Sequence, residues 1–288
     1  MKAKEKILIA GGDLRQLYCA LRLSEKYDTA IAGFDEEFLI SEDKFCKVSF
    51  DKNQVYDYAV LPVPPLGEEG MLNTPCCSEK INLKLIRDML KPSGAVFAGK
   101  ADENLCSELN GLTIYDYMNR EELSLLNAIP TAEGAVQLAM EEMPVTLNNL
   151  KILIVGCGRI GTALINILKG FGADITVAVR NSQGTAKARI MGIKSCCTKE
   201  IEYNFDLVFN TVPSMIFNYE LLKQFSQKTL FIDLASKPGG IDFEAASELG
   251  IKAIWALGLP GKTAPVTSGE IIADTVNGII EERGESDA

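Results

Sequence analysis

The chain has 288 residues, 47% of them hydrophobic and 24% charged, and its formal net charge is −10 at pH 7. This length and composition are typical of a globular protein of about two domains, and the excess of negative charge disfavours nucleic acid as a partner. The apolar runs are strand-length, far short of the ~20 residues that a membrane helix needs, and we see no signal peptide.

The cysteine pattern and the absence of histidine limit the possible metal sites and the expected compartment. Eight cysteines are scattered along the chain without a C-x-x-C pair, and there is no histidine. Zinc sites usually use these residue types at short spacing, so we expect no metal site. Free thiols are typical of a reducing compartment, and we therefore expect a cytoplasmic protein.

The first segment, residues 1–128, is predicted to form an α/β domain. Apolar runs and spacings predict strands at 6–10, 29–32, 58–63, 95–98 and 112–115, and helices at 14–24 and 81–90. The turn after the first strand reads Gly11-Gly12-Asp13-Leu14-Arg15-Gln16 and lacks the third glycine of a dinucleotide loop. Asp13 is better interpreted as a helix N-cap, in a degenerate nucleotide-type domain reused for substrate contacts.

A helical segment is expected to lead from this domain to the next. Residues 121–128 are predicted to be helical. Pro130 is then typical of the first turn of a further helix that runs to about Glu142 and crosses between the domains.

Residues Lys151 to Arg180 carry the strongest functional signal. An apolar strand leads into the turn Gly156-Cys157-Gly158-Arg159-Ile160-Gly161, a helical pattern and a second strand. A GxGxxG turn in such a βαβ unit is typical of dinucleotide binding. The three glycines allow the tight turn, the approach of a pyrophosphate and the close packing of the helix, whose N-terminus attracts phosphate. The alternative is a βαβ unit that keeps the glycines only for packing.

The end of the second strand indicates which dinucleotide is bound. An Asp or Glu there usually accepts hydrogen bonds from the NAD ribose, but this chain has Arg180-Asn181-Ser182. A guanidinium pairs with a 2′-phosphate, which a carboxylate would repel. The sequence therefore predicts NADP, unless Arg180 is only a solvated residue at a strand end.

Six strands are expected in residues 129–264, at 151–155, 175–179, 192–195, 207–210, 229–233 and 252–255. With helices between them they predict a Rossmann NADP-binding domain. A long apolar helix from about Thr267 to Glu281 is left over and is expected to return to the first domain, which then comprises residues 1–128 plus 265–288. The predicted fold class is α/β with two doubly wound domains.

Ligands of such sheets bind beyond the carboxyl ends of the strands. The segment after the fourth strand, residues 210–214, is expected to face the nicotinamide, with Thr211 and Pro213 packed on it, although Ser214 could instead cap the next helix. Asp233, after the fifth strand, either accepts a hydrogen bond from the carboxamide or caps the next turn. Arg15 could hold a carboxylate with two hydrogen bonds, or be a surface arginine.

The missing histidine constrains the reaction. Reversible hydride transfer to a ketone usually needs a tuned acid, commonly His. An oxidation that forms an aromatic ring places a smaller demand on an acid or base, because the stability of the product drives it. Glu133 and Lys262 are the candidates for a base, but a helix cap and a solvated lysine explain them equally, and the catalytic base stays unassigned.

Five segments resemble the A-subunit family of dipicolinate synthase, from endospore-forming bacteria: GGDLRQ at 11–16, NAIPTAEG at 127–134, GCGRIG at 156–161, IDLASKPGG at 232–240 and GLPGKTAP at 258–265. They extend over most of the chain. More distantly, the layout is similar to formate/glycerate dehydrogenases and adenosylhomocysteine hydrolases. Lys262 departs from the family pattern, in which an apolar residue is expected.

The resemblance implies NADP-dependent oxidation of dihydrodipicolinate, or of its hydroxylated tetrahydro precursor, to pyridine-2,6-dicarboxylate in the mother-cell cytoplasm during sporulation. It also implies the flavoprotein-like B-subunit of dipicolinate synthase as a partner. The expected substrate-binding residues are Arg15, Gln16, Thr131, Ser214, Lys262 and Thr263. The expected cofactor-binding residues are Gly156, Gly158, Arg159, Ile160, Gly161, Arg180, Asn181, Ser182, Thr211, Val212, Pro213 and Asp233.

Two other functions stay open. One is a 2-hydroxyacid dehydrogenase, against which the missing histidine speaks, and the other is a non-catalytic NADP-binding subunit. An oligomer is expected in either case.

Overall fold

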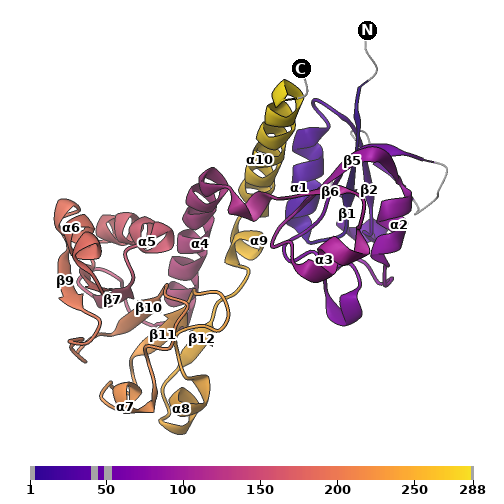
Figure 1. Ribbon diagram of the computed structural model, residues 1–288. Coiled ribbons are helices and arrows are strands. Elements are labelled where there is room, and N and C mark those ends of the chain that lie inside the picture. The colour runs from indigo at the N-terminus through magenta and orange to yellow at the C-terminus, as the bar shows by residue number, and fades with distance from the viewer. Residues whose placement is uncertain (1–3, 40–44, 49–53, 287–288) are drawn as a thin grey trace. The chain divides into compact units, whose positions relative to one another are not determined.

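The computed structural model describes residues 4–39, 45–48 and 54–286 (Figure 1). The chain divides into one unit of Met1–Leu126 and Ala264–Ala288, here called unit 1, and a second of Asn127–Thr263, called unit 2. Each unit is built on a parallel sheet of six strands with helices on both faces. The predicted α/β class with two doubly wound domains is confirmed.

Unit 1 alternates strands and helices along the chain, and its strands lie in the order β3-β2-β1-β4-β5-β6. The strands are β1 (Lys6–Ala10), β2 (Asp28–Ala32), β3 (Cys46–Lys47), β4 (Tyr56–Val60), β5 (Leu90–Ala98) and β6 (Thr113–Asp116). The helices are α1 (Leu14–Leu23), α2 (Leu83–Asp88), α3 (Glu103–Glu108) and α10 (Pro265–Ser286).

Helix α10 packs along α1 on one face of this sheet (Figure 1). Its Ile272, Val276 and Ile279 are buried in the same core as Leu17 and Leu23 of α1. Burial of apolar surface is the main stabilising contribution here, because the ion pairs at the edges of the contact, Arg22–Asp274 and Lys26–Glu281, are exposed. The expectation that the last helix returns to the first domain is confirmed.

Unit 2 repeats the plan of unit 1, with strand order β12-β11-β10-β7-β8-β9. Its strands are β7 (Lys151–Val155), β8 (Asp174–Val179), β9 (Lys194–Cys197), β10 (Leu207–Asn210), β11 (Leu230–Asp233) and β12 (Ala253–Trp255). Its helices are α5 (Arg159–Gly170), α6 (Ser182–Ile190), α7 (Tyr219–Leu222), α8 (Phe243–Glu248) and α9 (Leu259–Thr263), and it contains most of α4 (Glu121–Glu142).

The connecting helix differs from its prediction. Instead of two helices with a start at Pro130, α4 is one continuous helix with that proline inside it. An internal proline removes one backbone hydrogen bond at a cost of ~3 kcal/mol. The helix continues because its buried face, which includes Ala128 before the proline and Ala132 and Ala135 after it, stays packed along its length.

Smaller differences concern short elements. Neither the short helix at residues 259–263 nor the two-residue strand β3 was predicted. Strand β4 begins and ends earlier than its predicted range of 58–63. Pairing with neighbouring strands determines such ends, and a single run of residues does not contain that information.

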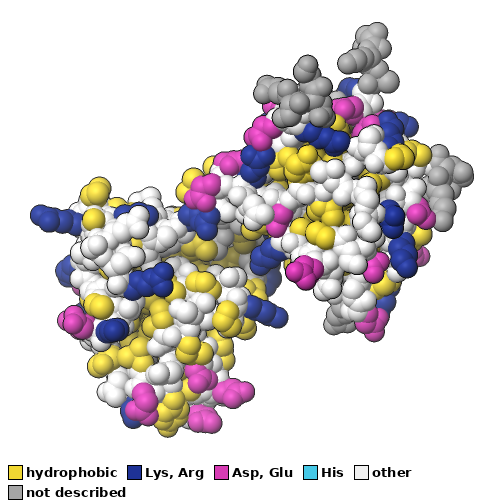
Figure 2. Space-filling view, in the orientation of Figure 1, with side chains coloured by type: hydrophobic (Ala, Val, Ile, Leu, Met, Phe, Trp, Pro, Cys, Tyr) yellow, Lys and Arg dark blue, Asp and Glu magenta, His cyan; other side chains and the backbone are white. Residues whose placement is uncertain are grey.

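The described surface carries charged side chains of both signs (Figure 2), as expected for a chain in which 24% of the residues are charged. Figure 2 shows Lys and Arg side chains interspersed with Asp and Glu over the described part of the visible face. All eight cysteines lie in the described residues and are free thiols. Within residues 4–39, 45–48 and 54–286, no helix has both the length and the apolar character to span a bilayer.

The contact between α10 and α1 depends on Gly269. A Cβ at this position would lie 2.4 Å from the Arg15 carbonyl oxygen and 2.7 Å from the Cβ of Tyr18. We expect Gly269→Ala to lower the free energy of unfolding by about 1–3 kcal/mol, as overpacking typically does. Gly278→Ala on the same helix is the control, because its Cβ would meet nothing within 4 Å. Equal stability of the two variants in urea unfolding would contradict the prediction.

Candidate functional site

The turn between β7 and α5 is tight and depends on two glycines. Gly156 has a φ of +100°, which non-glycine residues rarely adopt, and its Cβ would lie 2.4 Å from Thr211 Oγ1. A Cβ at Gly161 would lie 2.2 Å from the Gly156 carbonyl oxygen, so the first turn of α5 packs directly against the loop. Both positions exclude any larger residue.

Gly158 differs from these two glycines. It is the N-cap of α5, it offers no side chain for a capping hydrogen bond, and a Cβ there would meet nothing within 4 Å. The space beside Gly158 is therefore open, and the first N–H groups of a 12-residue helix point toward it. A helix N-terminus of this kind favours an anionic group such as a pyrophosphate. The residues present fit a dinucleotide.

A pocket of about 630 Å³ opens beside this turn, at the carboxyl ends of β7, β8 and β10. Its wall consists of the glycine turn, the end of β8, one face of α6 and the loop after β10. The lining residues are Gly156, Cys157, Gly158, Ala178, Val179, Arg180, Asn181, Gln183, Gly184, Lys187, Thr198, Thr211, Val212, Pro213, Ser214 and Ile216. No Asp or Glu is among them, so the pocket has the electrostatics of an anion site inside an acidic protein.

A buried polar cluster holds the loop after β10. Asp233 is fully buried and accepts hydrogen bonds from Asn210 Nδ2 at 2.7 Å, Gly240 N at 2.7 Å and Ala235 N at 3.0 Å. Asn210 Nδ2 also donates to the Val212 carbonyl oxygen at 3.0 Å. The cluster joins the ends of β10 and β11 and shapes one wall of the pocket.

Seven of the twelve residues expected to contact the cofactor line this pocket. The other five lie elsewhere: Arg159, Ile160, Gly161, Ser182 and Asp233 are not in its wall. Ile160 packs against the core and Gly161 contacts the turn below it. The Asp233 carboxylate accepts hydrogen bonds from the turn that follows it, and a contact with the carboxamide stays a prediction.

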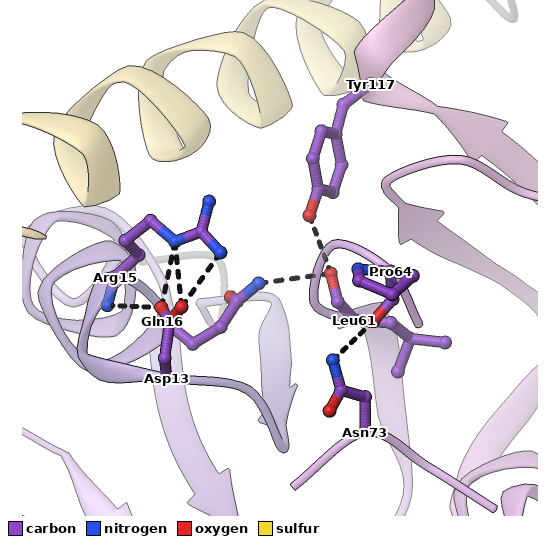
Figure 3. Close-up of polar contacts among 7 residues, drawn as sticks. All are labelled: Asp13, Arg15, Gln16, Leu61, Pro64, Asn73 and Tyr117. Atoms are coloured by element: carbon purple, nitrogen blue, oxygen red, sulfur yellow. Dashed lines mark hydrogen bonds and ion pairs between the residues drawn. The ribbon is translucent and has the colours of Figure 1, made fainter. Parts of the chain in front are cut away.

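Arg15 and Gln16 begin α1 in unit 1 (Figure 3). Asp13 caps the helix as predicted and also accepts from Arg15 Nε at 2.9 Å and Nη2 at 2.8 Å. Burial tends to lower the pKa of Arg15, but the hydrogen bond and charge of Asp13 outweigh it and raise that pKa. Arg15 is thus a cation held by Asp13, with only 15% of its side chain exposed.

Gln16 is buried beside it. Its Nε2 donates to the Leu61 carbonyl oxygen at 3.1 Å, and the Tyr117 hydroxyl donates to the same oxygen at 2.9 Å (Figure 3). Burial raises the pKa of Tyr117 above the usual range, which keeps the phenol neutral and able to donate. Within the described residues, Gln16 Oε1 is buried without a hydrogen-bond partner.

The remaining substrate and base candidates take separate positions. Thr131 is buried, and its hydroxyl donates to the Asn127 carbonyl oxygen within α4. Glu133 is exposed and borders an apolar groove between α4 and α5, apart from the pocket of the glycine turn. Lys262 is exposed on α9, and Thr263 packs against Gly134. The structure therefore singles out neither Glu133 nor Lys262 as a base.

Sequence reasoning missed Lys187, which the structure brings to the pocket wall. Its sequence signal is weak, because it lies about two helical turns after the strand end at Arg180. Asn210, expected to face the nicotinamide, donates a hydrogen bond to Asp233 in the buried cluster under the wall.

The fold and this pocket define a dinucleotide-binding protein, and a family match shows that its second unit is a domain of the dehydrogenase type of oxidoreductase. Residues 127–241 match the family of the D-isomer specific 2-hydroxyacid dehydrogenase, NAD binding domain. Residues 6–118 match the N-terminal domain of the dipicolinate synthase A-subunit.

Whole-chain comparisons agree with both family matches. The dipicolinate synthase A-subunit of Bacillus subtilis (strain 168) is 33% identical over 288 residues, covering 96% of each chain. The crystal structure of the B. subtilis A-subunit superposes with a TM-score of 0.86 at 31% identity over 99% of both chains. The A-subunit structure from Bacillus halodurans gives 0.82 at 30% identity, covering 95% of this chain and 97% of that one. The chain belongs to the dipicolinate synthase A-subunit family.

The open space beside Gly158 yields a test of the dinucleotide site. We expect Gly158→Ala to fold normally, because its Cβ meets no protein atom, and to weaken nicotinamide dinucleotide binding by at least about tenfold, because the methyl group occupies the space for the pyrophosphate. Gly170→Ala at the end of the same helix is the control, since its Cβ is equally unobstructed. Calorimetry of both variants with both coenzymes decides. Unchanged affinity in Gly158→Ala would contradict this position of the phosphates.

Proposed function

We propose that the chain oxidises dihydrodipicolinate, or its hydroxylated tetrahydro precursor, to pyridine-2,6-dicarboxylate with NADP⁺. The observation that carries this proposal is the full-length similarity to the dipicolinate synthase A-subunit, together with a nucleotide pocket that no carboxylate lines. In that pocket, an oxidised nicotinamide would supply the hydride acceptor.

The choice of NADP rests on the wall of the pocket. Arg180 follows β8, where a NAD-specific protein usually has a carboxylate, and Asn181 caps α6 beside it. A guanidinium binds a phosphate monoester with parallel hydrogen bonds. The absence of a repelling carboxylate among the lining residues supports the same choice.

The substrate role falls on Arg15. A dicarboxylate needs discrete cations in a protein of net charge −10, and Asp13 holds this guanidinium in place before any ligand arrives. Asp13 uses Nε and Nη2, and no described residue accepts from Nη1, which is left for a substrate carboxylate. Preorganisation of this kind reduces the entropy lost on binding. Gln16, Thr131, Ser214, Lys262 and Thr263 complete the proposed substrate contacts.

The demands on a catalytic base are modest. Loss of a hydride and a proton from the dihydropyridine ring yields an aromatic product, whose stability drives the reaction. Water or a weakly basic group therefore suffices, which fits a chain without histidine. A 2-hydroxyacid dehydrogenase reaction is disfavoured on the same ground.

Membership of the family supports a proposal for the cellular setting. We propose a role in sporulation in the mother-cell cytoplasm, with the flavoprotein-like B-subunit of dipicolinate synthase as partner. Purified chain supplied with fresh dihydrodipicolinate and NADP⁺ should form NADPH and pyridine-2,6-dicarboxylate in equal amounts. Turnover that requires the B-subunit would instead favour a non-catalytic cofactor-binding chain.

Arg15→Ala should weaken pyridine-2,6-dicarboxylate binding about ten- to one-hundredfold, the range for loss of a charged hydrogen bond. Coenzyme affinity should stay unchanged, because Arg15 lies in unit 1 and the nucleotide pocket in unit 2. Arg22→Ala, which removes an exposed arginine of the same helix, is the control. Equal dicarboxylate affinity of the two variants in calorimetry would exclude a substrate role for Arg15.

Arg180→Asp should reverse the coenzyme preference from NADP to NAD. The carboxylate repels the 2′-phosphate and accepts hydrogen bonds from the free ribose hydroxyls. The measurement is the ratio of the dissociation constants for NADP⁺ and NAD⁺ in the two proteins. A ratio that the substitution does not move would refute the assignment of Arg180.

A further inference from the structure

Lys187 is the second cation in the wall of the nucleotide pocket, and nothing in the sequence motifs draws attention to it. It lies on α6 together with Gln183 and Gly184, which also line the pocket. Residues three and four apart share one face of a helix. The face of α6 that carries Lys187 is therefore turned to the pocket, whereas Arg189 on the same helix does not line it.

Close packing of α6 holds this exposed lysine in the wall of the pocket. A Cβ at Gly184 would lie 2.8 Å from Val179, so the helix packs directly against the end of β8 at this point. Val179 and Arg180, at the end of that strand, line the same pocket as Lys187.

The charges of Lys187 and Arg180 are not neutralised by the protein. Within residues 4–39, 45–48 and 54–286, neither side chain forms an ion pair with a carboxylate. Arg15, Arg22 and Arg120, by contrast, are all paired. Two unpaired cations on one wall without a carboxylate form a site for a doubly charged anion.

We propose that Lys187 is a specificity-determining residue that binds the adenosine 2′-phosphate together with Arg180. This inference rests on the proposed function, since it deepens the choice of NADP. A phosphate monoester carries between about one and a half and two negative charges at neutral pH, about twice what one guanidinium neutralises. Arg180 supplies the planar pair of donors, and Lys187 supplies a second point charge from the neighbouring helix.

The competing role for Lys187 is contact with the pyrophosphate. That group is expected at the N-terminus of α5, whereas Lys187 belongs to α6, which begins directly after Arg180 and Asn181. The two roles differ in the ligand fragment that each affects. A 2′-phosphate contact acts only on ligands with that group, and a pyrophosphate contact acts on every adenine nucleotide.

Fragment binding separates them without any turnover. Adenosine 2′,5′-bisphosphate and adenosine 5′-monophosphate are titrated by calorimetry into the full chain at low ionic strength. Lys187→Ala should weaken the bisphosphate about five- to tenfold, as for a partly exposed charged contact, and leave the monophosphate unchanged. Lys187→Arg should keep most of the affinity for the bisphosphate. Arg189→Ala, which removes one positive charge from the same helix, should change neither.

Each contrary result has a distinct meaning. Equal weakening of both fragments by Lys187→Ala would overturn the proposal in favour of a 5′-phosphate or pyrophosphate contact. A wild-type preference for the bisphosphate that survives in Lys187→Ala would overturn the role of Lys187 and leave the choice of NADP intact. If the wild-type chain showed no preference for the bisphosphate, the choice of NADP and the role of Lys187 would both fail.

Discussion

The pocket depends on one steric constraint, the contact between the first turn of α5 and the loop that precedes it. A Cβ at Gly161 would lie 2.2 Å from the Gly156 carbonyl oxygen, so this distance permits hydrogen and nothing larger. The contact aligns the helix with the end of β7 and directs its first N–H groups to the space beside Gly158. Three glycines thus have three separate tasks: conformation, access and packing.

The wall formed by the loop after β10 depends on buried polar groups, whereas the glycine turn depends on residues without a side chain. The Asp233 carboxylate accepts three hydrogen bonds, one from Asn210 at the end of β10 and two from the loop after β11. Asn210 also donates to the Val212 carbonyl oxygen and so fixes the loop after β10. A buried carboxylate is tolerated only with such partners, since an unpaired charge in the interior is costly. The pocket therefore has a rigid frame on both sides before a ligand binds, while its cations, Arg180 and Lys187, are exposed and adaptable.

Much of this architecture was predictable because the signals are local. Apolar runs of strand length, the glycine turn and the N-cap at Asp13 each depend on a few consecutive residues. The misses concern distant partners. Pro130 is typical of a helix start until packing on both sides of it is known. The hydrogen bond from Asn210 to Asp233 joins residues 23 positions apart, and no short stretch of sequence reveals it. Lys187 was missed because its role depends on the packing of α6 against β8.

The return of α10 to α1 has a consequence for biosynthesis. The two helices that bury each other's apolar faces stand at opposite ends of the chain, so the ribosome finishes one long before it makes the other. The segment Asn127–Thr263 is continuous in sequence and is synthesised before α10. Folding during synthesis therefore favours unit 2 as the first domain to fold. The apolar face of α1 stays exposed until α10 is made, and chaperones are expected to bind it in that interval.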